Sequence, residues 1–187
     1  MYINFLDKGS RMINLKENFA FKGILLKNFI NASIEEKEMV RECRNDESIR
    51  KWMYSDEIIS QEEHFNFLEN LQKDNKNFYW IVYKDEGFIG VISLNNINIK
   101  NKNAYLGIYS NPFCEMKNKG SLLSNCLKKV AFDIFELHSL KLEVIENNER
   151  AIDFYKKMGF EEEGILKEFV CKDGNWLNVI IMGIINK

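Results

Sequence analysis

The sequence predicts an α/β (α+β) protein with a mixed, mostly antiparallel central sheet of about seven strands and helices on both faces. Strand-like and helical patterns alternate from Phe19 onward, which favours a sheet with crossover helices. Turn residues join several strand patterns directly, and this indicates hairpins. In chain order we expect a strand over 19–29, helices over 33–45 and 60–73, strands over 77–84, 88–94 and 105–109, a helix over 121–136, a strand over 140–145, a helix over 149–158, and strands over 160–171 and 176–185.

The helices are predicted from their ends and from their apolar sides. Ser33 is a candidate N-cap that is followed by acidic residues in the first turn. Ser60 stands three residues before Glu63, which is the spacing of a capping box. The segment 121–136 carries apolar residues at helical spacing. Gly159 marks the end of the last helix, because glycine is the residue type expected just past a helix C-terminus.

The strands are predicted from aromatic and β-branched runs that turn signals separate. The run over 77–84 is joined to 88–94 by Asp85-Glu86-Gly87, which predicts a hairpin. The segment 140–145 alternates as a buried strand does. The strong turn signal Lys172-Asp173-Gly174-Asn175 separates the last two strands, which we therefore expect to pair.

Length and charge limit the class of protein. A chain of 187 residues with 45% hydrophobic content is the usual size of one domain, which we place over 19–187 after an N-terminal extension over 1–18. The formal net charge of −2 gives no global field toward nucleic acid or an anionic membrane, so we expect neither as a partner. No apolar stretch approaches the ~18 residues of a membrane span and no signal peptide is evident, so we expect a cytoplasmic location.

Four cysteines and two histidines do not form a metal-binding pattern. The cysteines are widely separated, with no Cys-x-x-Cys pair, so we expect reduced structural thiols and no metal. They are Cys43, Cys114, Cys126 and Cys171.

The segment NNERAIDFYKKMGF at 147–160 is the most specific short motif in the chain. Together with the order of elements it resembles the GNAT acetyltransferase family, over nearly everything from Phe19 onward. Three segments, WMYS at 52–55, YLGIYSNPF at 105–113 and LHSLKLEVIENN at 137–148, resemble the acetyltransferases of bacterial pseudaminic acid biosynthesis. That family acetylates the free amine of a UDP-linked amino dideoxy altrose derivative. The resemblance implies acetyl-CoA as acetyl donor and a UDP-linked amino sugar as acceptor; a homodimer is a candidate assembly.

The turn before the helix at Ser121 is the candidate pyrophosphate site, because backbone N–H groups at a helix start bind phosphates. The family places Arg or Gln and then two small residues here, whereas this chain carries Glu115, Asn118 and Gly120, so the motif is degenerate. Asn118 tolerates a left-handed backbone better than most residues. Charge in place of the usual Arg comes from the flanking lysines, Lys117 and Lys119. The alternative is an ordinary loop between strand and helix.

The resemblance implies three further contacts to the coenzyme. The backbone around Ile108 and Tyr109 would polarise the thioester carbonyl, and Tyr109 would line the acetyl pocket. Asn148 would bond the pantetheine arm, with capping of the following helix as the alternative.

Two residues are predicted to transfer protons when acetyl moves directly from thioester to amine. The resemblance implies that Tyr155 lies beside the coenzyme sulfur and protonates the departing thiolate, and the ordinary pKa of a phenol, about 10, is near the ~8.5 of a thiol. Glu143 lies mid-strand between apolar neighbours, which suggests a wet cleft, and would accept the amine proton through a water. The alternatives are a core aromatic and an outward-facing strand residue.

The acceptor side is predicted from the first helices and the loop that follows. Trp52, Met53 and Tyr54 suit a nucleotide base and a sugar ring, whereas Arg44 and His64 suit a diphosphate. Each has a structural alternative: core packing for Trp52 and Met53, helix capping or surface decoration for His64, and pairing with Glu47 for Arg44. Residues that border the same pocket are Phe67 and Tyr105.

Two other functions stay open at this stage. One is a GNAT acetyltransferase of polyamines or protein N-termini, which would need an acidic cleft or a peptide groove. The other is a non-catalytic regulatory protein on the GNAT fold, which the degenerate phosphate loop permits.

Overall fold

The computed structural model describes residues 5–6, 12–13 and 16–187. Most of the segment 1–15, and with it most of the predicted extension over 1–18, lies outside the described residues. The described part of that segment is a short antiparallel ladder between β1 (Phe5–Leu6) and β2 (Met12–Ile13).

Among the described residues, eight strands form the main sheet in the spatial order β3-β4-β5-β6-β7-β8-β10-β9. All neighbouring strands are antiparallel except β7 and β8, which are parallel. The mixed, mostly antiparallel sheet expected from the sequence is therefore confirmed. The strands are β3 (Phe19–Phe21), β4 (Ile24–Asn28), β5 (Phe78–Lys84), β6 (Gly87–Asn98), β7 (Asn103–Ser110), β8 (Ser139–Ile145), β9 (Glu161–Lys172) and β10 (Asn175–Ile185).

The predicted first strand over 19–29 is wrong, because this segment folds back on itself. Lys22 and Gly23 have φ values of 49° and 74° and form the tight turn between β3 and β4. Two consecutive positive φ angles match the right-handed twist of the flanking strands, and Gly23 adopts this conformation without a Cβ penalty. The sheet consequently has one strand more than expected.

Two helices begin where their serine caps predict, whereas the helix predicted from Ser121 begins at Lys119 without a side-chain cap. The side chain of Ser33 accepts a hydrogen bond from the backbone N–H of Glu36, and Ser60 does the same for Glu63; in each case the glutamate closes a capping box. A short helix, α2, was not predicted. The helices are η1 (Phe29–Asn31), α1 (Ile34–Asn45), α2 (Glu47–Arg50), α3 (Gln61–Lys73), α4 (Lys119–Lys128), the π-helical continuation η2 (Lys129–Ile134) and α5 (Glu149–Lys157).

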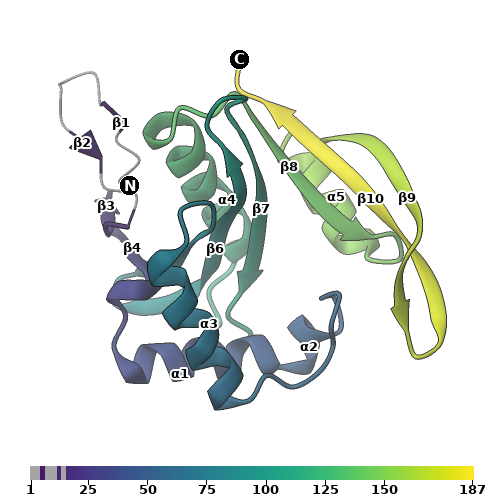
Figure 1. Cartoon of the computed structure of the whole chain (residues 1–187), viewed down its shortest axis with the longest axis horizontal. Coiled ribbons are helices and arrows are strands. Elements are labelled where there is room, and N and C mark those ends of the chain that lie inside the picture. Colours follow the sequence, from purple (N-terminus) through teal and green to yellow (C-terminus); the bar gives the residue numbers. More distant parts are fainter. Residues whose placement is uncertain (1–4, 7–11, 14–15) are drawn as a thin grey trace.

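Helices cover both faces of the sheet (Figure 1). On one face α4 and α5 pack on a core that includes Trp80, Leu127 and Leu142. On the other face α1 and α3 pack on a second core that includes Ile81 and Val91. No helix in the described part of the chain is long and apolar enough to cross a membrane.

The strands β7 and β8 separate along their length, and this opening determines where the site lies. They pair only from Asn103 to Tyr105 on β7 and from Ser139 to Lys141 on β8. Both strands continue beyond that point, and Figure 1 shows them diverging. The facing edges of Leu106–Ser110 and Leu142–Ile145 therefore have no strand-to-strand hydrogen bonds with each other.

Candidate active site

The N-terminus of α4 presents free backbone donors. Its N-cap, Asn118, has a left-handed backbone with φ of 59°, as the sequence suggested, and its side chain makes no capping bond. The first N–H groups of a helix have no partner within the helix, and they lie at the positive end of the helix dipole. This end of α4 suits an anionic phosphate.

A cavity of about 630 Å³ adjoins this helix end. Three predicted coenzyme contacts line it, Lys117, Asn118 and Ser121. Lys22, Lys84 and Lys129 line it as well, so the cavity is basic although the whole chain is slightly acidic. Local lysines thus supply positive charge that the missing motif arginine does not.

Lys119 and Gly120 have structural tasks in this loop. The Lys119 ammonium donates to the carbonyl oxygen of Asn111, at 2.6 Å, and to that of Cys114, so it fastens the loop before α4. A Cβ on Gly120 would lie 3.2 Å from Cε2 of Phe154 on α5. Gly120 therefore permits close packing of α4 on α5 in addition to its predicted approach to phosphate.

Ile108 and Tyr109 lie in the part of β7 that no longer pairs with β8. Ile108 packs against the core under α4, whereas Tyr109 packs on the opposite face with α1 and α3. Burial raises the pKa of the Tyr109 phenol; among its neighbours Cys43 raises this pKa further and Arg44 lowers it. Their backbone groups lie beside the opening, and binding of a thioester by these groups stays a prediction.

Asn148 caps α5, as the alternative prediction held. Its side-chain oxygen accepts a hydrogen bond from Ala151 N–H at 3.2 Å. The cap occupies the amide oxygen only, so the amide NH₂ group stays free to donate to a pantetheine carbonyl.

Tyr155 lies on α5 and packs against the main core. Its ring contacts that of Phe160 at 5.6 Å between centroids. Burial raises the pKa of Tyr155 to about 12. The phenol is therefore protonated at neutral pH, but its pKa lies farther above the ~8.5 of a thiol than the sequence argument assumed. The reason is desolvation, which disfavours the charged phenolate.

Glu143 is exposed on β8 and accepts a hydrogen bond from the hydroxyl of Tyr54, 89 positions away. Leu142 and Val144 point into the core under α5, so strand alternation places Glu143 on the opposite face. Tyr105 shares that face and is one of the groups that raise the pKa of Tyr54, after burial and Glu143. The predicted base and two predicted acceptor residues therefore meet beside the opening.

Two arginines hold the segment 51–59, which connects α2 to α3. Arg44 donates from Nη2 to the Ser55 carbonyl oxygen at 3.4 Å, and Arg50 donates to the Asp56 carbonyl oxygen. The Nη1 of Arg44 and the Nε of Arg50 are buried and have no hydrogen-bond partner in the described part of the chain. Burial lowers the pKa of Arg44, and the charge of Arg50 lowers it further. Within residues 16–187 neither arginine forms an ion pair with a carboxylate, so the predicted alternative of pairing with Glu47 is not seen.

The other acceptor candidates divide between this segment and the helix interface. Trp52 is 36% exposed under the Lys51 ammonium, which lies 5.5 Å from its ring centroid, whereas Met53 packs on the second core. Phe67 is half-exposed on α3 and meets the ring of Tyr79 edge-on at 5.3 Å.

The role predicted for His64 does not fit its position. Its side chain is 6% exposed, and its Nε2 lies 3.0 Å from the carbonyl oxygen of Lys37 on α1. Burial lowers its pKa, so the ring is neutral at physiological pH. A buried, neutral and already bonded ring joins α1 to α3 and cannot reach a diphosphate.

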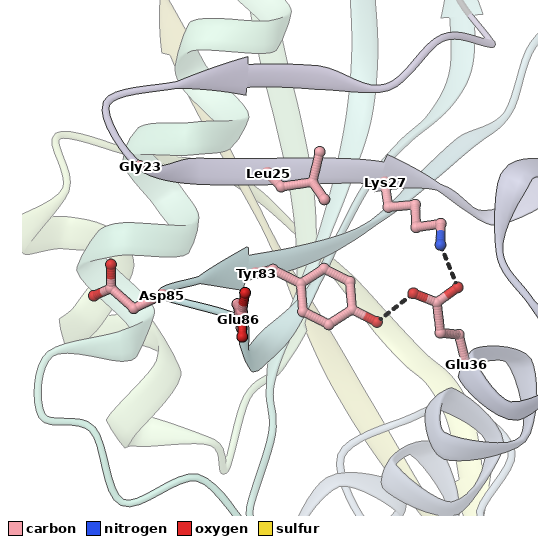
Figure 2. Close-up of a pocket in the computed structure, with 7 residues that line it drawn as sticks. All are labelled: Gly23, Leu25, Lys27, Glu36, Tyr83, Asp85 and Glu86. Atoms are coloured by element: carbon pink, nitrogen blue, oxygen red, sulfur yellow. Dashed lines mark hydrogen bonds and ion pairs between the residues drawn. The ribbon is translucent and has the colours of Figure 1, made fainter.

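A second pocket, of about 300 Å³, lies at the edge of the sheet away from this opening (Figure 2). Glu36 ion-pairs with Lys27 at 2.6 Å and accepts a hydrogen bond from the Tyr83 hydroxyl at 2.9 Å. Asp85 and Glu86 stand at the adjacent turn. The Glu36 carboxylate is thus already paired with a positive charge. Among the described residues, no group of three or more His, Cys, Asp or Glu side chains is placed to hold a metal ion.

Sequence reasoning missed Arg50 and Phe169. Arg50 lies on α2, which no pattern predicted, although its closeness to WMYS was a usable signal. Phe169, on β9, contacts the ring of Tyr54 at 6.0 Å and 72°. No local pattern connects it to the site, because only the pairing of β9 with β10 brings it there.

Comparison with known proteins gives one family. The model of the acetyltransferase (GNAT) domain matches residues 31–181. Acetyltransferase PseH of Campylobacter jejuni serotype O:2 is 35% identical over 137 residues, which are 73% of this chain and 84% of that protein. Spermidine N(1)-acetyltransferase of Escherichia coli K12 is 25% identical over 150 residues, 80% of this chain and 81% of that protein.

Two solved structures are similar in fold. The crystal structure of C. jejuni PseH in complex with acetyl coenzyme A has a TM-score of 0.67 and 27% identity, covering 88% of this chain and 99% of that one. Spermidine N-acetyltransferase of Vibrio cholerae, in complex with CoA and spermine, has a TM-score of 0.79. At 24% identity, with 87% of this chain and 95% of that one covered, the second likeness supports the fold alone.

Proposed function

This chain belongs to the GNAT family of N-acetyltransferases, and we propose that it transfers acetyl from acetyl-CoA to the free amine of a UDP-linked amino sugar. The observation that carries the choice of acceptor is the pair of guanidinium groups of Arg44 and Arg50 behind the aromatic segment 52–54. Each has a buried N–H group without a partner. Positive charge without a counter-ion suits the diphosphate of a nucleotide sugar.

The resemblance to PseH supports the same acceptor. At 35% identity this relative is more similar than the spermidine acetyltransferases. The segments WMYS, YLGIYSNPF and LHSLKLEVIENN, which resemble acetyltransferases of pseudaminic acid biosynthesis, include Tyr54, Tyr105 and Glu143. These three side chains meet in space.

The donor end of the site fits the phosphates and the thioester of acetyl-CoA. The open N-terminus of α4 and the lysines of the 630 Å³ cavity would hold the pyrophosphate. The free edge of β7 around Ile108 and Tyr109 would bind the thioester carbonyl through its backbone. Acetyl-CoA supplies an activated acetyl group. The protein therefore needs only to orient the two substrates, exclude water from them and transfer protons.

Proton transfer would use groups on both sides of the opening. Glu143, exposed to solvent, would accept the proton that the amine loses, through a water. Tyr155, which is neutral at physiological pH, would donate its hydroxyl hydrogen to the sulfur as the bond between carbon and sulfur breaks. Its raised pKa makes hydrogen-bond donation easier to sustain than complete proton transfer.

A polyamine acceptor is the second candidate, and the 25% identity to the spermidine N(1)-acetyltransferase of Escherichia coli K12 favours it. A polyamine is a polycation and would approach the uncompensated charges of Arg44 and Arg50, which disfavours it here. The acidic pocket of Figure 2 is a poor binding site for a polyamine, because Lys27 already pairs with Glu36.

A cytoplasmic location and a homodimer stay predictions from the sequence.

The test is release of free CoA from acetyl-CoA with a panel of acceptors: UDP-linked 4-amino sugars, spermidine and a basic peptide. Turnover confined to a UDP-amino sugar is expected. Turnover with spermidine or peptide alone would overturn the proposed UDP-linked acceptor but leave the proposed acetyl transfer standing. Absence of both turnover and acetyl-CoA binding would favour a non-catalytic regulatory protein.

UDP alone gives a second test of the acceptor pocket. Titration calorimetry should detect UDP binding to the wild type, and Arg44→Gln should weaken it about tenfold or more, as loss of a hydrogen bond to a charged group predicts. Equal UDP affinity in the two proteins would remove Arg44 from the acceptor pocket.

A further inference from the structure

The hydroxyl of Tyr54 is already hydrogen-bonded to a carboxylate, so its donor hydrogen is not available to an acceptor substrate. It donates a hydrogen bond to Oε2 of Glu143. In the described part of the chain, Glu143 has no ion-pair partner. The orientation of the predicted base therefore depends on a tyrosine of the acceptor segment.

The rest of the molecule holds Tyr54 in this position. The ammonium of Lys172, on the β9–β10 hairpin, donates to the carbonyl oxygen of Lys51 at 2.7 Å. On the other side of Tyr54, Arg44 and Arg50 donate to the carbonyls of Ser55 and Asp56. The Tyr54 ring also meets the ring of Phe169 edge-on at 6.0 Å. Contacts before and after Tyr54 thus restrict the segment, and the residues that make them are far apart in the sequence.

The hydrogen bond leaves a defined chemical role for each oxygen of the carboxylate. A phenol that donates to Oε2 restricts rotation of the group, and Oε1 keeps its lone pairs for an incoming proton. Burial and the neighbouring Glu143 raise the pKa of Tyr54, so the phenol remains a donor at neutral pH. Tyr54 therefore keeps its own proton.

We propose that Tyr54 is a positioning residue, whose hydroxyl holds Glu143 so that Oε1 faces the acceptor amine or its bridging water. As the new N–C bond forms and the C–S bond breaks, Oε1 takes the proton from nitrogen, and the Tyr54 O–H bond stays intact. This inference rests on the proposed function only for the base role of Glu143. It does not depend on which amine is the acceptor.

A double-mutant cycle tests the inference, with Tyr54→Phe, Glu143→Gln and the double variant assayed at saturating acetyl-CoA. Tyr54→Phe should lower kcat about tenfold and leave the KM of the acceptor within about twofold, because it misplaces a catalytic group without removing a binding contact. In the Glu143→Gln background the same change should alter kcat less than about twofold. If Tyr54→Phe instead raises the acceptor KM equally in both backgrounds, Tyr54 binds the sugar and the inference is wrong.

Tyr83→Phe is the matched control. Tyr83 donates to the Glu36 carboxylate at 2.9 Å, the same kind of pair on the same sheet but in the pocket of Figure 2. Its replacement should leave kcat unchanged, which separates loss of the Glu143 contact from a general effect of removing a tyrosine hydroxyl.

The inference stays testable if the UDP-linked sugars are not acceptors. The cycle is then run with whichever amine of the panel releases CoA. If none does, denaturant unfolding of the same four proteins measures the coupling directly: the effects of Tyr54→Phe and Glu143→Gln on stability should be non-additive. Additive effects would show that the hydrogen bond contributes nothing, and would overturn the inference.

Discussion

Tyr155 and Glu143 lie on opposite faces of the sheet, on the two sides of the opening between β7 and β8. Tyr155 packs from α5 against the core that contains Leu142 and Val144, whereas Glu143 alternates to the other face. A thioester and an amine that meet in the opening would thus have a proton donor on one side and a proton acceptor on the other.

Tyr155→Phe tests the donor. Because burial raises the pKa of Tyr155 to about 12, the wild-type hydroxyl is present as a donor at any ordinary assay pH. Its removal should lower kcat about 10²-fold, the low end for general acid catalysis, and leave the Kd of acetyl-CoA within about twofold. Steady-state kinetics and calorimetry measure the two quantities. A fully active variant would remove Tyr155 from the mechanism.

Trp52→Ala tests the nucleotide contact. Trp52 is the large aromatic of the acceptor segment and is 36% exposed, so part of its side chain is accessible to a base, although the Lys51 ammonium lies over the ring. Loss of base stacking should raise the acceptor KM about tenfold with little change in kcat. Ile58→Ala is the control, because Ile58 is 68% exposed in the same segment. Unchanged acceptor kinetics in Trp52→Ala, or an equal change in Ile58→Ala, would place the nucleotide elsewhere.

Gly120→Ala tests the phosphate loop. A Cβ at this position would lie 3.2 Å from Cε2 of Phe154, so the Phe154 ring must move by a few tenths of an ångström. We expect a higher KM for acetyl-CoA and a lower melting temperature. Gly120→Ala combined with Phe154→Leu, which relieves the contact, should recover most of the melting temperature.

The double variant also separates the two roles of Gly120. A KM for acetyl-CoA that remains high after the melting temperature recovers indicates direct obstruction of the phosphates. If both quantities recover together, packing of α4 on α5 is the whole effect, and the approach of the Gly120 backbone to phosphate is not needed.

His64 predicts a pH dependence of stability. Burial lowers its folded-state pKa below the ~6.5 of an unfolded histidine. As pH falls below about 6.5 the unfolded state takes up a proton that the folded state refuses, so the free energy of unfolding decreases until the folded pKa is passed. Above that window the group contributes no pH dependence.

Denaturant unfolding at several pH values between about 7.5 and 5 measures this effect. His64→Gln keeps a side-chain donor for the Lys37 carbonyl and should reduce the slope in this window. His138→Gln, which removes the other histidine, an exposed one, is the matched control variant. The same slope in His64→Gln and in the wild type would assign the dependence to other groups.

Much of the fold was predictable because its signals are local. Ser33 and Ser60 form capping boxes with residues three positions on, and the backbone of Asp85-Glu86 and of Asp173-Gly174 turns sharply. The error over 19–29 has a local cause as well. Lys22-Gly23 lies inside an apolar run, and a two-residue turn leaves little interruption in hydrophobicity.

The candidate site divides in the same way. Asn118, with its left-handed backbone, and Asn148, as a helix cap, act through hydrogen bonds and dihedral angles of their own neighbourhood, so the sequence indicated them. The position of His64 shortly after WMYS suggested that its side chain contacts the substrate. Packing of α1 on α3 instead buries the ring, which is hydrogen-bonded to the Lys37 carbonyl oxygen. Its burial depends on a helix that begins thirty residues earlier, at Ile34.

The sequence by itself determined the family, the order of elements and the residue types that acetyl transfer needs, since these follow from short-range patterns and from resemblance. Tertiary structure alone decided that Tyr54 reaches Glu143, that Arg44 and Arg50 lie together with no ion-pair partner among the described residues, and that β8 leaves β7 after three residue pairs. Each of these features depends on contacts between distant parts of the chain. Such contacts contribute free energy only after the helices have packed on both faces of the sheet.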